Sequence, residues 1–557
     1  MQNTGLPAVA FMSSVALAKE EAKEGTPEHR NTGVFLRVNF SQASRHGWLI
    51  VFVIALLIFS WLHSVSTFSD PDAYYHGVLA QAAWSGHIPT ALPQAWFTEL
   101  RDQFTDQHLL YHIILGPFVA LFGVAVGLKI ASALLGAGAV ATFYAVVRAL
   151  GVRQAWMPTV LLLLTPAWLY RLGLVKVTPL SLIILLVGIL LAVRRRPLAL
   201  AALAWIYVYV YVGFLLLPLV VTVLLFVDWG AGRIQDKERE IKNTGNTENT
   251  RQLLKPKTYN LKPTRLLVVG AVWLGAAIGL IVNPYFPGNI HQFYVQFMAI
   301  GVVNQSGIEV AGEWYPALLQ WMLTHATVSF VAMALAVVAA AAAPRRKLVA
   351  GFTAIALCAL VFTVRSRRYI EYFAPLALLA AAVALHCPTA VCQWLKRVSR
   401  RVLVVGVCLA IAGVAVLGVI ELRQVRGALN NFFPASGMGA ACDWLKQNVP
   451  PNTMVFNVNW GEWPLFYGCT QELRYVAGLD MRFMYRSYPE LAQRYQRIAR
   501  GELSGPELTR TISQDFKAQY VVVTDNNPNA ATALATAPGL VKVYHDPRVA
   551  IYKLSQP

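Results

Sequence analysis

Long apolar runs constrain the fold of this chain more than any other feature. The first run, residues 48–65, contains no acidic residue, lysine or arginine, and similar runs recur as far as residue 421. A helix of about 20 apolar residues crosses the hydrocarbon core of a bilayer. Charged residues make up only 13% of the chain, against about 25% in soluble domains. The sequence therefore predicts a polytopic α-helical membrane protein with about 11–13 spans, near residues 48–66, 126–148, 155–170, 179–193, 197–212, 213–229, 265–283, 319–341, 348–364, 369–387 and 402–421.

The basic residues predict how these spans are oriented. The arginine-rich loops fall on one side of the membrane if the apolar segment 109–125, which carries His112, is interfacial or re-entrant. The positive-inside rule makes that side cytoplasmic. The same loops account for the net charge of +19, so nucleic acid is not expected as a partner. We expect a multi-pass protein of the bacterial cytoplasmic membrane, with the N-terminus inside and the C-terminus outside.

This orientation divides the chain into three parts. Residues 1–47 are mixed and polar, and we expect a disordered cytoplasmic leader there. Residues 48–421 form the membrane domain, and its loops 67–125, 171–178 and 284–318 face outward. Residues 422–557 have the short β-branched runs of a soluble, extracytoplasmic α/β domain, with strands expected at 452–458, 474–477 and 520–524 and a final hairpin over 541–553.

Cys442 and Cys469 both lie in this C-terminal domain. Disulfides persist in oxidising compartments outside the cytosol. The two residues are therefore expected to pair if the domain is extracytoplasmic.

An acidic motif directly follows the first span. It reads Asp70-Pro71-Asp72-Ala73-Tyr74-Tyr75-His76 and lies at the expected water interface. Charged groups at that depth are costly and usually functional. Such paired carboxylates serve as a general base, as metal ligands or as a sugar-binding edge. A solvated loop with a proline-directed turn remains the alternative.

Arginines also occur on the side where the positive-inside rule does not expect them. Arg365, Arg367 and Arg368 lie between two spans at the outer surface. Arginine binds phosphate in a bidentate manner, so the cluster predicts an anionic partner near the membrane. A tight hairpin with snorkelling side chains is the alternative.

These motifs resemble those of the oligosaccharyltransferase catalytic subunit, a GT-C membrane glycosyltransferase. The acidic motif at Asp70 resembles the family's first acidic motif, and residues 166–171 resemble its approach to the second external loop. Residues 306–309 resemble a Ser/Thr-x-x-Glu motif, and residues 368–375 resemble a segment whose arginine binds carrier phosphate. The resemblance implies Asp70, Asp72 and Glu309 as catalytic residues. It also implies that Arg368 binds the carrier phosphate. From the chemistry of the residues, we expect Arg367 and Arg171 to complete this phosphate site, together with Lys176.

One departure concerns the metal. The family binds a divalent cation with a second acidic pair, but residues 172–180 contain no carboxylate and do contain Lys176. Asp70 is then the one metal ligand that the resemblance carries over, and a Mg²⁺ or Mn²⁺ site is doubtful. We hypothesise that Lys176 supplies the positive charge that a metal would otherwise offer to the leaving phosphate. Snorkelling of Lys176 at a span end is the alternative.

A second departure concerns the acceptor. The family reads its sequon with Trp-Trp-Asp-Tyr-Gly, whereas this chain has Asn459-Trp460-Gly461-Glu462-Trp463-Pro464. His76, Trp460, Glu462 and Trp463 are the candidate acceptor or sugar residues. Burial of the two tryptophans in a domain core is the alternative.

Two further groups lie in the external loops. Glu309 or Glu313 could close over a bound substrate as part of a lid. Asp106, His108 and His112 form a second polar cluster whose spacing suits a metal or a sugar. A helix cap and interfacial polar residues are the alternative for this cluster.

The sequence thus predicts a GT-C glycosyltransferase that moves a sugar or oligosaccharide from a polyprenyl-phosphate or -diphosphate carrier to a protein or glycan at the outer face. A transporter or flippase of lipid-linked sugars remains open, although such proteins usually have internal repeats, and none is apparent here. A non-catalytic polysaccharide-assembly subunit also remains open, because the second acidic pair is missing.

Overall fold

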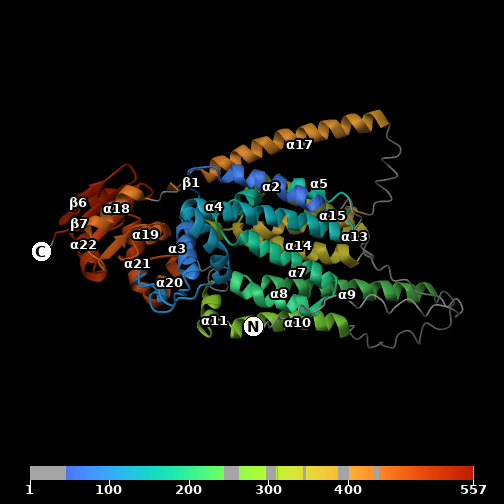
Figure 1. Cartoon of the computed structure of the whole chain (residues 1–557), viewed down its shortest axis with the longest axis horizontal. Helices are drawn as coiled ribbons and strands as arrows, with labels where there is room; N and C mark the ends of the chain where they lie inside the picture. The colour runs from blue at the N-terminus through green and yellow to red at the C-terminus, as the bar shows by residue number, and fades with distance from the viewer. Residues whose placement is uncertain are drawn as a thin grey trace, which may run out of the picture. The chain divides into compact units, whose positions relative to one another are not determined.

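The computed structural model describes residues 46–243, 263–296, 309, 311–342, 347–386, 400–430, 433–434 and 438–555. Most of the predicted leader 1–47, much of the basic loop 230–264 and the motif residues 306–308 lie outside these ranges. The described part consists of a set of apolar helices followed by a domain with a five-stranded sheet (Figure 1).

The apolar helices follow the predicted spans closely. They are α2 (Gly47–His63), α5 (Trp156–Leu163), α7 (Thr178–Val193), α8 (Pro197–Val210), α9 (Leu216–Asn243), α10 (Pro263–Ile281), α14 (Lys347–Arg365), α15 (Ile370–Leu385) and α17 (Arg400–Leu429). Neighbouring helices pack in pairs, α2 on α4 (Leu109–Ala149), α4 on α7 and α8 on α10 (Figure 1). Their shared core is apolar and rich in alanine, as close helix packing in membranes requires.

Four described helices are long and apolar enough to cross a membrane, and a fifth is added if the pair α12 (Leu319–His325) and α13 (Thr327–Ala342), bent by 98°, is one span. Four further apolar helices have 10–17 residues. The predicted total of about 11–13 spans stays a prediction, but the polytopic helical fold class is confirmed.

A kink divides helix α4 (Leu109–Ala149). Gly123 has φ 75° and ψ 166°, a conformation that glycine adopts without the steric cost of a side chain. Residues before the kink therefore run in a different direction from those after it. This break agrees with the sequence-based separation of segment 109–125 from the span at 126–148.

Three elements differ in extent from their predictions. The predicted span 155–170 is broken into α5 and α6 (Pro166–Leu172) around Thr165, because Pro166 favours a new helix start. Helix α9 continues to Asn243, and α17 continues past the expected domain boundary at 421 to Leu429. Both extensions contain good helix-forming residues, so the helices do not end where their apolar stretches end.

The C-terminal domain is α/β, as expected. Its sheet has the order β4-β3-β5-β7-β6. Strand β3 (Met454–Asn457) is parallel to β4 (Arg474–Tyr475) and β5 (Tyr520–Thr524), and β7 (Val549–Leu554) pairs antiparallel with β5 and β6 (Leu540–His545). The three predicted strands and the terminal hairpin are confirmed.

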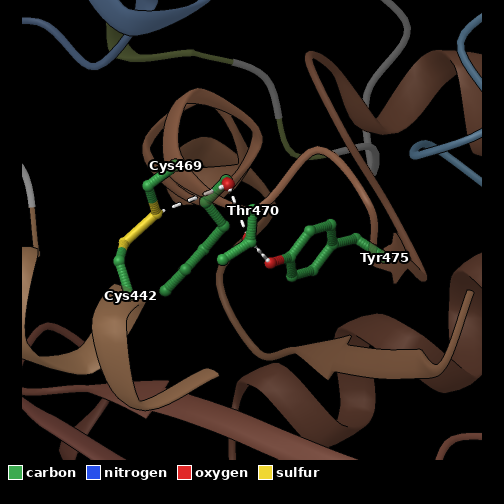
Figure 2. Close-up of a disulfide and its surroundings, with 5 residues drawn as sticks. Cys442, Cys469, Thr470 and Tyr475 are labelled. Carbon is green, nitrogen blue, oxygen red and sulfur yellow. Dashed lines mark hydrogen bonds between the residues drawn. A yellow bond between two sulfur atoms is a disulfide. The ribbon is translucent and has the colours of Figure 1, made fainter. Parts of the chain in front are cut away.

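A disulfide joins Cys442 of helix α18 (Gly439–Asn448) to Cys469 at the end of α19 (Trp463–Cys469) (Figure 2). The two Cα atoms are 6.0 Å apart, within the range usual for such bonds. Thr470, next to the bridge, hydrogen-bonds Tyr475 of β4 (Figure 2). The predicted pairing is confirmed, and it fastens α18 to α19.

The C-terminal domain contacts the membrane domain through helix α3 (Asp72–Trp84), which packs on α19 (Figure 1). Tyr75 of α3 contacts the rings of Trp463 and Tyr467, with centroids 6.4 and 6.3 Å away. A Cβ atom at Gly468 would lie 2.9 Å from Cβ of Tyr74. The approach of the two helices therefore requires glycine at position 468.

Candidate active site

A cavity of about 820 Å³ lies between the membrane helices and the C-terminal domain. Its wall includes the start of α3, the α6–α7 connection, the 3-10 helices η3 (Gly312–Trp314) and η4 (Arg367–Tyr369), and residues 460–461 and 479–480 of the C-terminal domain. Cavities of this size accommodate drug-sized ligands. Most of the charged residues singled out in the sequence line this one space.

The acidic motif forms the start of α3. The Oδ1 atom of Asp70 accepts a hydrogen bond from the backbone N–H of Asp72, 2.9 Å away, and Asp72 begins the helix. An acidic residue in the first helical turn is stabilised by the helix dipole. The alternative of a fully solvated loop does not describe this segment, because residues 73–80 are buried.

Lys176 lies against both carboxylates of the motif. Its Nζ is 2.7 Å from Asp70 Oδ2 and 3.3 Å from Asp72 Oδ2. Desolvation in the cavity wall and then the nearby Asp70 raise the pKa of Asp72 to about 6, against the opposing effect of Lys176. Burial alone would lower the pKa of Lys176, but the surrounding carboxylates of Asp70, Glu313 and Asp72 raise it above its ordinary value. The ammonium group therefore stays charged.

Glu313 connects the cationic residues of the site. Its Oε2 accepts hydrogen bonds from Arg171 Nη1 at 2.5 Å and from Lys176 Nζ at 3.2 Å, and its Oε1 accepts one from Arg368 Nη1 at 2.8 Å. Burial alone would raise the pKa of Glu313, but Arg171, Lys176 and Arg368 hold it well below its usual range. Three cations thus converge on one anionic group.

The two arginines are held by further contacts. Arg171, at the end of α6, donates from Nε to Glu371 Oε1 at 2.6 Å, and Glu371 is fully buried. The guanidinium of Arg368 lies 4.7 Å from the ring centroid of Trp314, a cation–π arrangement. Both side chains are therefore fixed in orientation, which favours recognition of a planar or tetrahedral oxyanion.

Arg367 lies at the edge of this group. Its Nε donates to the carbonyl oxygen of Pro316 at 3.2 Å, and its guanidinium lies 5.7 Å from the ring of Trp321. It lines the cavity, but no ion pair joins it to the carboxylates among the described residues.

Four residues of the segment 459–464 are buried within the C-terminal domain: Trp460, Glu462, Trp463 and Pro464. Glu462 accepts hydrogen bonds from Thr524 at 2.9 Å and Asn526 at 2.7 Å. The Trp463 ring stacks on Tyr467 with centroids 4.6 Å apart. Neither Glu462 nor Trp463 lines the cavity, whereas Trp460 does. The structure therefore brings Trp460 and the neighbouring Gly461 to the cavity, but not Glu462 or Trp463.

Glu309 also lies apart from the cluster. It is exposed and does not line the cavity, whereas Glu313, four residues later, occupies its centre. The sequence offered both as lid residues because they lie in one external loop, and the resemblance implied Glu309 as the catalytic one. The ion pairs of Glu313 come from residues more than 50 positions away, so no local pattern distinguishes them.

Two site carboxylates were not singled out as functional from the sequence. Asp480 lines the cavity from the C-terminal domain and caps helix α20 (Met481–Ser487) through a hydrogen bond from the N–H of Arg482. Burial raises the pKa of Asp480 to about 7. The capping position is readable in the sequence, but its proximity to the membrane domain is not. Glu371, the partner of Arg171, lies within the motif at 368–375, but nothing in that motif marks its carboxylate as part of the site.

The polar cluster of the first external loop lies beside the same cavity. His76 and His108 line it, and Asp106 and His112 lie directly behind them, joined by a hydrogen bond of 2.6 Å. Oδ1 of Asp106 accepts a hydrogen bond from the backbone N–H of His108 just before α4. This bond turns the chain ahead of the helix and is not a capping hydrogen bond of α4, whose N-cap is His108.

The residues of the site do not fit a divalent cation. The acidic side chains that would hold one, Asp70, Asp72 and Glu313, surround the ammonium group of Lys176 instead. Within the described ranges, no group of three or more His, Cys, Asp or Glu side chains is arranged to bind a metal ion.

No protein-family model matches the sequence, and no curated protein matches it significantly. Solved structures do match. The Archaeoglobus fulgidus oligosaccharyltransferase, tethered to an acceptor peptide containing an NVT sequon, has a TM-score of 0.57 at 14% identity, over 92% of this chain and 74% of that one. ArnT from Cupriavidus metallidurans bound to undecaprenyl phosphate has a TM-score of 0.53 at 15% identity, over 92% and 100% of the two chains.

The mycobacterial arabinofuranosyltransferase AftD gives a TM-score of 0.52 at 15% identity, and this chain covers 40% of its length. At these identities the similarity establishes the fold. The chain is an integral, multi-pass membrane protein with a GT-C-like fold. The chain is similar in fold to ArnT and AftD as well as to the oligosaccharyltransferase. The comparisons therefore do not establish the predicted, more specific resemblance to the oligosaccharyltransferase.

Proposed function

We propose that this protein is a glycosyltransferase that moves a sugar or oligosaccharide from a polyprenyl-phosphate or -diphosphate carrier to an acceptor. The observation that carries the proposal is the convergence of Arg171, Lys176 and Arg368 on the carboxylate of Glu313. A phosphate group offers the same cations more oxygens and more charge than a carboxylate does. The site is therefore suited to bind the carrier phosphate.

The same cations serve the chemical step. When the bond between the sugar and the carrier breaks, negative charge develops on the departing phosphate. Fixed cations in a water-poor cavity stabilise such charge strongly. Arg368 and Arg171 hold the phosphate oxygens, Arg367 contributes from the edge, and Lys176 neutralises the leaving group.

Lys176 takes the role that a divalent cation has in the oligosaccharyltransferase family. Its three carboxylate contacts support this assignment, because Asp70, Asp72 and Glu313 orient the ammonium group as they would orient a metal. A Mg²⁺- or Mn²⁺-dependent reaction is accordingly not part of the proposal. The charge on Lys176 is a permanent part of the chain.

The acceptor approaches from the C-terminal domain, which contributes Trp460, Asp480 and Phe483 to the cavity. The disulfide between Cys442 and Cys469 supports an oxidising compartment for this domain. The proposed reaction therefore takes place at the outer face of a bacterial cytoplasmic membrane, on a protein or a glycan.

The test is donor turnover by purified protein in nanodiscs. Wild type, Asp70→Asn and the control Asp102→Asn would receive a synthetic pool of undecaprenyl monophosphate- and diphosphate-linked sugars, and released carrier phosphate would be measured. Asp102 is an exposed acid of the same external loop, paired with Arg101. We expect release by wild type and the control, and a loss of roughly 100-fold or more in Asp70→Asn, because Lys176 loses its nearest partner.

Absence of release by wild type, with intact folding, would refute the glycosyltransferase proposal. Movement of intact lipid-linked sugars across the bilayer of sealed vesicles that contain the protein would favour a flippase instead.

A further inference from the structure

A buried chain of three side chains ends at the cavity. Nδ1 of His112 lies 2.6 Å from Oδ2 of Asp106, and Nε2 of His112 lies 2.8 Å from Nδ1 of His76. All three residues are at most 4% exposed. Both ring nitrogens of His112 are therefore engaged, one on each side.

The hydrogen bonds determine which nitrogens carry protons. The Oδ2 atom of Asp106 accepts a hydrogen bond, so the Nδ1 of His112 donates it. In a neutral imidazole the other nitrogen is then an acceptor, so Nε2 of His112 accepts from Nδ1 of His76. This leaves the Nε2 atom of His76 with a free lone pair. The logic is the one by which a carboxylate sets the tautomer of a catalytic histidine.

His76 also has the correct position. It is four residues after Asp72 on helix α3, so the two side chains lie on one helix face, and both line the cavity together with Lys176 and Arg368. Within the described part of the chain, no hydrogen bond is made to Nε2 of His76. The basic nitrogen is therefore available to a molecule in the cavity.

The carboxylate of Asp70 is less available. Asp70 uses Oδ2 for Lys176 and Oδ1 for the backbone N–H of Asp72. Accepting a proton there would weaken the contact that holds Lys176. Asp70 therefore holds the ammonium group of Lys176, whereas His76 is free to accept a proton.

We propose that His76 is the general base of the transfer reaction and that Asp106 and His112 are positioning residues that fix its tautomer. The inference rests on the proposed glycosyltransferase function and specifies its acceptor as a hydroxyl group. As the acceptor oxygen bonds to the anomeric carbon, the bond from that carbon to the phosphate oxygen breaks. The carrier phosphate keeps the electron pair, and the hydroxyl proton passes to Nε2 of His76.

The surroundings of His76 keep it neutral before the reaction. Burial, followed by the nearby His112, His108 and Lys176, lowers the pKa of His76 well below its ordinary value. The groups that face it are His108 and the α4 residues Tyr111 and His112, Lys176 from the α6–α7 connection and Asp72 on its own helix. From helix α19, Tyr467 contacts the neighbouring Tyr75.

The experiment compares wild type with His76→Ala, Asp106→Asn and the control His63→Gln in the nanodisc assay, with water and a pool of soluble hydroxyl compounds as acceptors. His63 is a buried histidine of α2 outside the cavity. Carrier-phosphate release is measured as a function of pH, with and without added imidazole. Loss of a general base costs roughly 10²- to 10⁴-fold in kcat.

We expect His76→Ala and Asp106→Asn to lose kcat to this extent, with the KM for the donor changed by less than about threefold. Imidazole should restore the activity of His76→Ala in proportion to its unprotonated fraction, and it should not affect Asp106→Asn. The acidic limb of the wild-type pH profile should be absent from the residual activity of His76→Ala. A merely structural role for His76 would give neither the imidazole rescue nor the loss of the acidic limb.

Release by wild type together with normal kcat in both variants would overturn the inference alone. Loss of activity in His76→Ala without rescue by imidazole would also overturn it. If wild type releases no carrier phosphate from any donor, the proposed function itself fails, and the inference fails with it. If Asp106→Asn does not fold, His76→Ala and its imidazole rescue decide the question.

Discussion

Replacing Lys176 with alanine should convert the site from one that contains its own cation into one that needs an added cation. The Nζ of Lys176 lies 2.7, 3.3 and 3.2 Å from the carboxylates of Asp70, Asp72 and Glu313, and the side chain is 9% exposed. Removing one partner of a buried ion pair typically destabilises a protein by about 3–5 kcal/mol, because the opposite charge is left unpaired. The variant should lose stability by about this amount, since up to three carboxylates are left without their shared partner.

The space that the Lys176 side chain leaves in Lys176→Ala should bind a divalent cation. Oxygen ligands from carboxylates are those that Mg²⁺ and Mn²⁺ prefer. A ligand that binds only the folded state stabilises it by about 2.7 kcal/mol at 100 times its Kd. Mn²⁺ should therefore raise the unfolding temperature of Lys176→Ala, whereas wild type should not respond, because its ammonium group occupies the position.

The assay combines thermal unfolding with carrier-phosphate release in nanodiscs, first in EDTA and then with excess Mn²⁺. Lys129→Ala is the matched control. Lys129 is a half-buried lysine outside the cavity that donates to the carbonyl of Val65. In EDTA we expect full wild-type activity and a loss of roughly 100-fold or more in Lys176→Ala, partly recovered with Mn²⁺. Lys129→Ala should not respond to Mn²⁺ in either measurement.

Two results would refute this reasoning. Loss of wild-type activity in EDTA, with recovery in Mn²⁺, would mean that the reaction depends on a metal that Lys176 does not replace. Full activity of Lys176→Ala in EDTA would mean that the lysine charge does not act on the leaving phosphate.

Three further predictions concern Arg368 in the cavity and two features of the C-terminal domain, Glu462 and the disulfide. Arg368→Gln should weaken binding of undecaprenyl phosphate about 10- to 100-fold, because a charge-assisted hydrogen bond contributes about 1.5–3 kcal/mol. Arg365→Gln is the control, since Arg365 belongs to the same arginine cluster in the sequence but is exposed and does not line the cavity. Equal affinities of the two variants would contradict a phosphate site at Arg368. Burial raises the pKa of Glu462 from an ordinary 4.5 to about 7, so its contribution to the stability of the fold is complete below pH 4.5 and is lost as the pH rises through 7. Glu462→Gln should remove this pH dependence, worth up to about 3 kcal/mol, from thermal unfolding curves, and an unchanged pH dependence would show that Glu462 is not its source. Replacing Cys442 and Cys469 with serine should lower the unfolding free energy of the C-terminal domain by about 2–4 kcal/mol, and the result should match that of adding reductant to wild type, whereas a reductant effect in the serine variant would point to another cause.

The sequence alone determined the architecture because helix and strand periods are local properties. Apolar runs predicted the helices α7 and α8 within two residues of their observed ends. The β-branched run at 520–524 predicted strand β5 with its observed limits. The sequence also predicted that segment 109–125 is separate from the span at 126–148. His112 interrupts the apolar pattern of that segment, and the helix changes direction at its end, at Gly123.

Part of the candidate site was also readable in this way. Asp70 stands out as a carboxylate directly after a span, and Lys176 and Arg368 stand out as basic residues on the side where the positive-inside rule does not expect them. Each lies at the end of a span, so its approximate depth follows from the sequence. The three regions they mark line one cavity.

The tertiary structure decided how these residues are combined. The choice of Glu313 over Glu309 depends on partners that are 55 and 142 positions away in the chain, and no local pattern encodes such pairs. The relay from Asp106 to His76 depends on the packing of α3 against α4, which brings together side chains 36 positions apart. Burial of Glu462 and Trp463 depends on distant partners, because Glu462 accepts a hydrogen bond from Thr524, 62 positions later, and Nε1 of Trp463 donates to the carbonyl oxygen of Gln94, 369 positions earlier. Secondary structure follows from neighbours in sequence, whereas the chemistry of this site follows from neighbours in space, and only the packing of the helices specifies those.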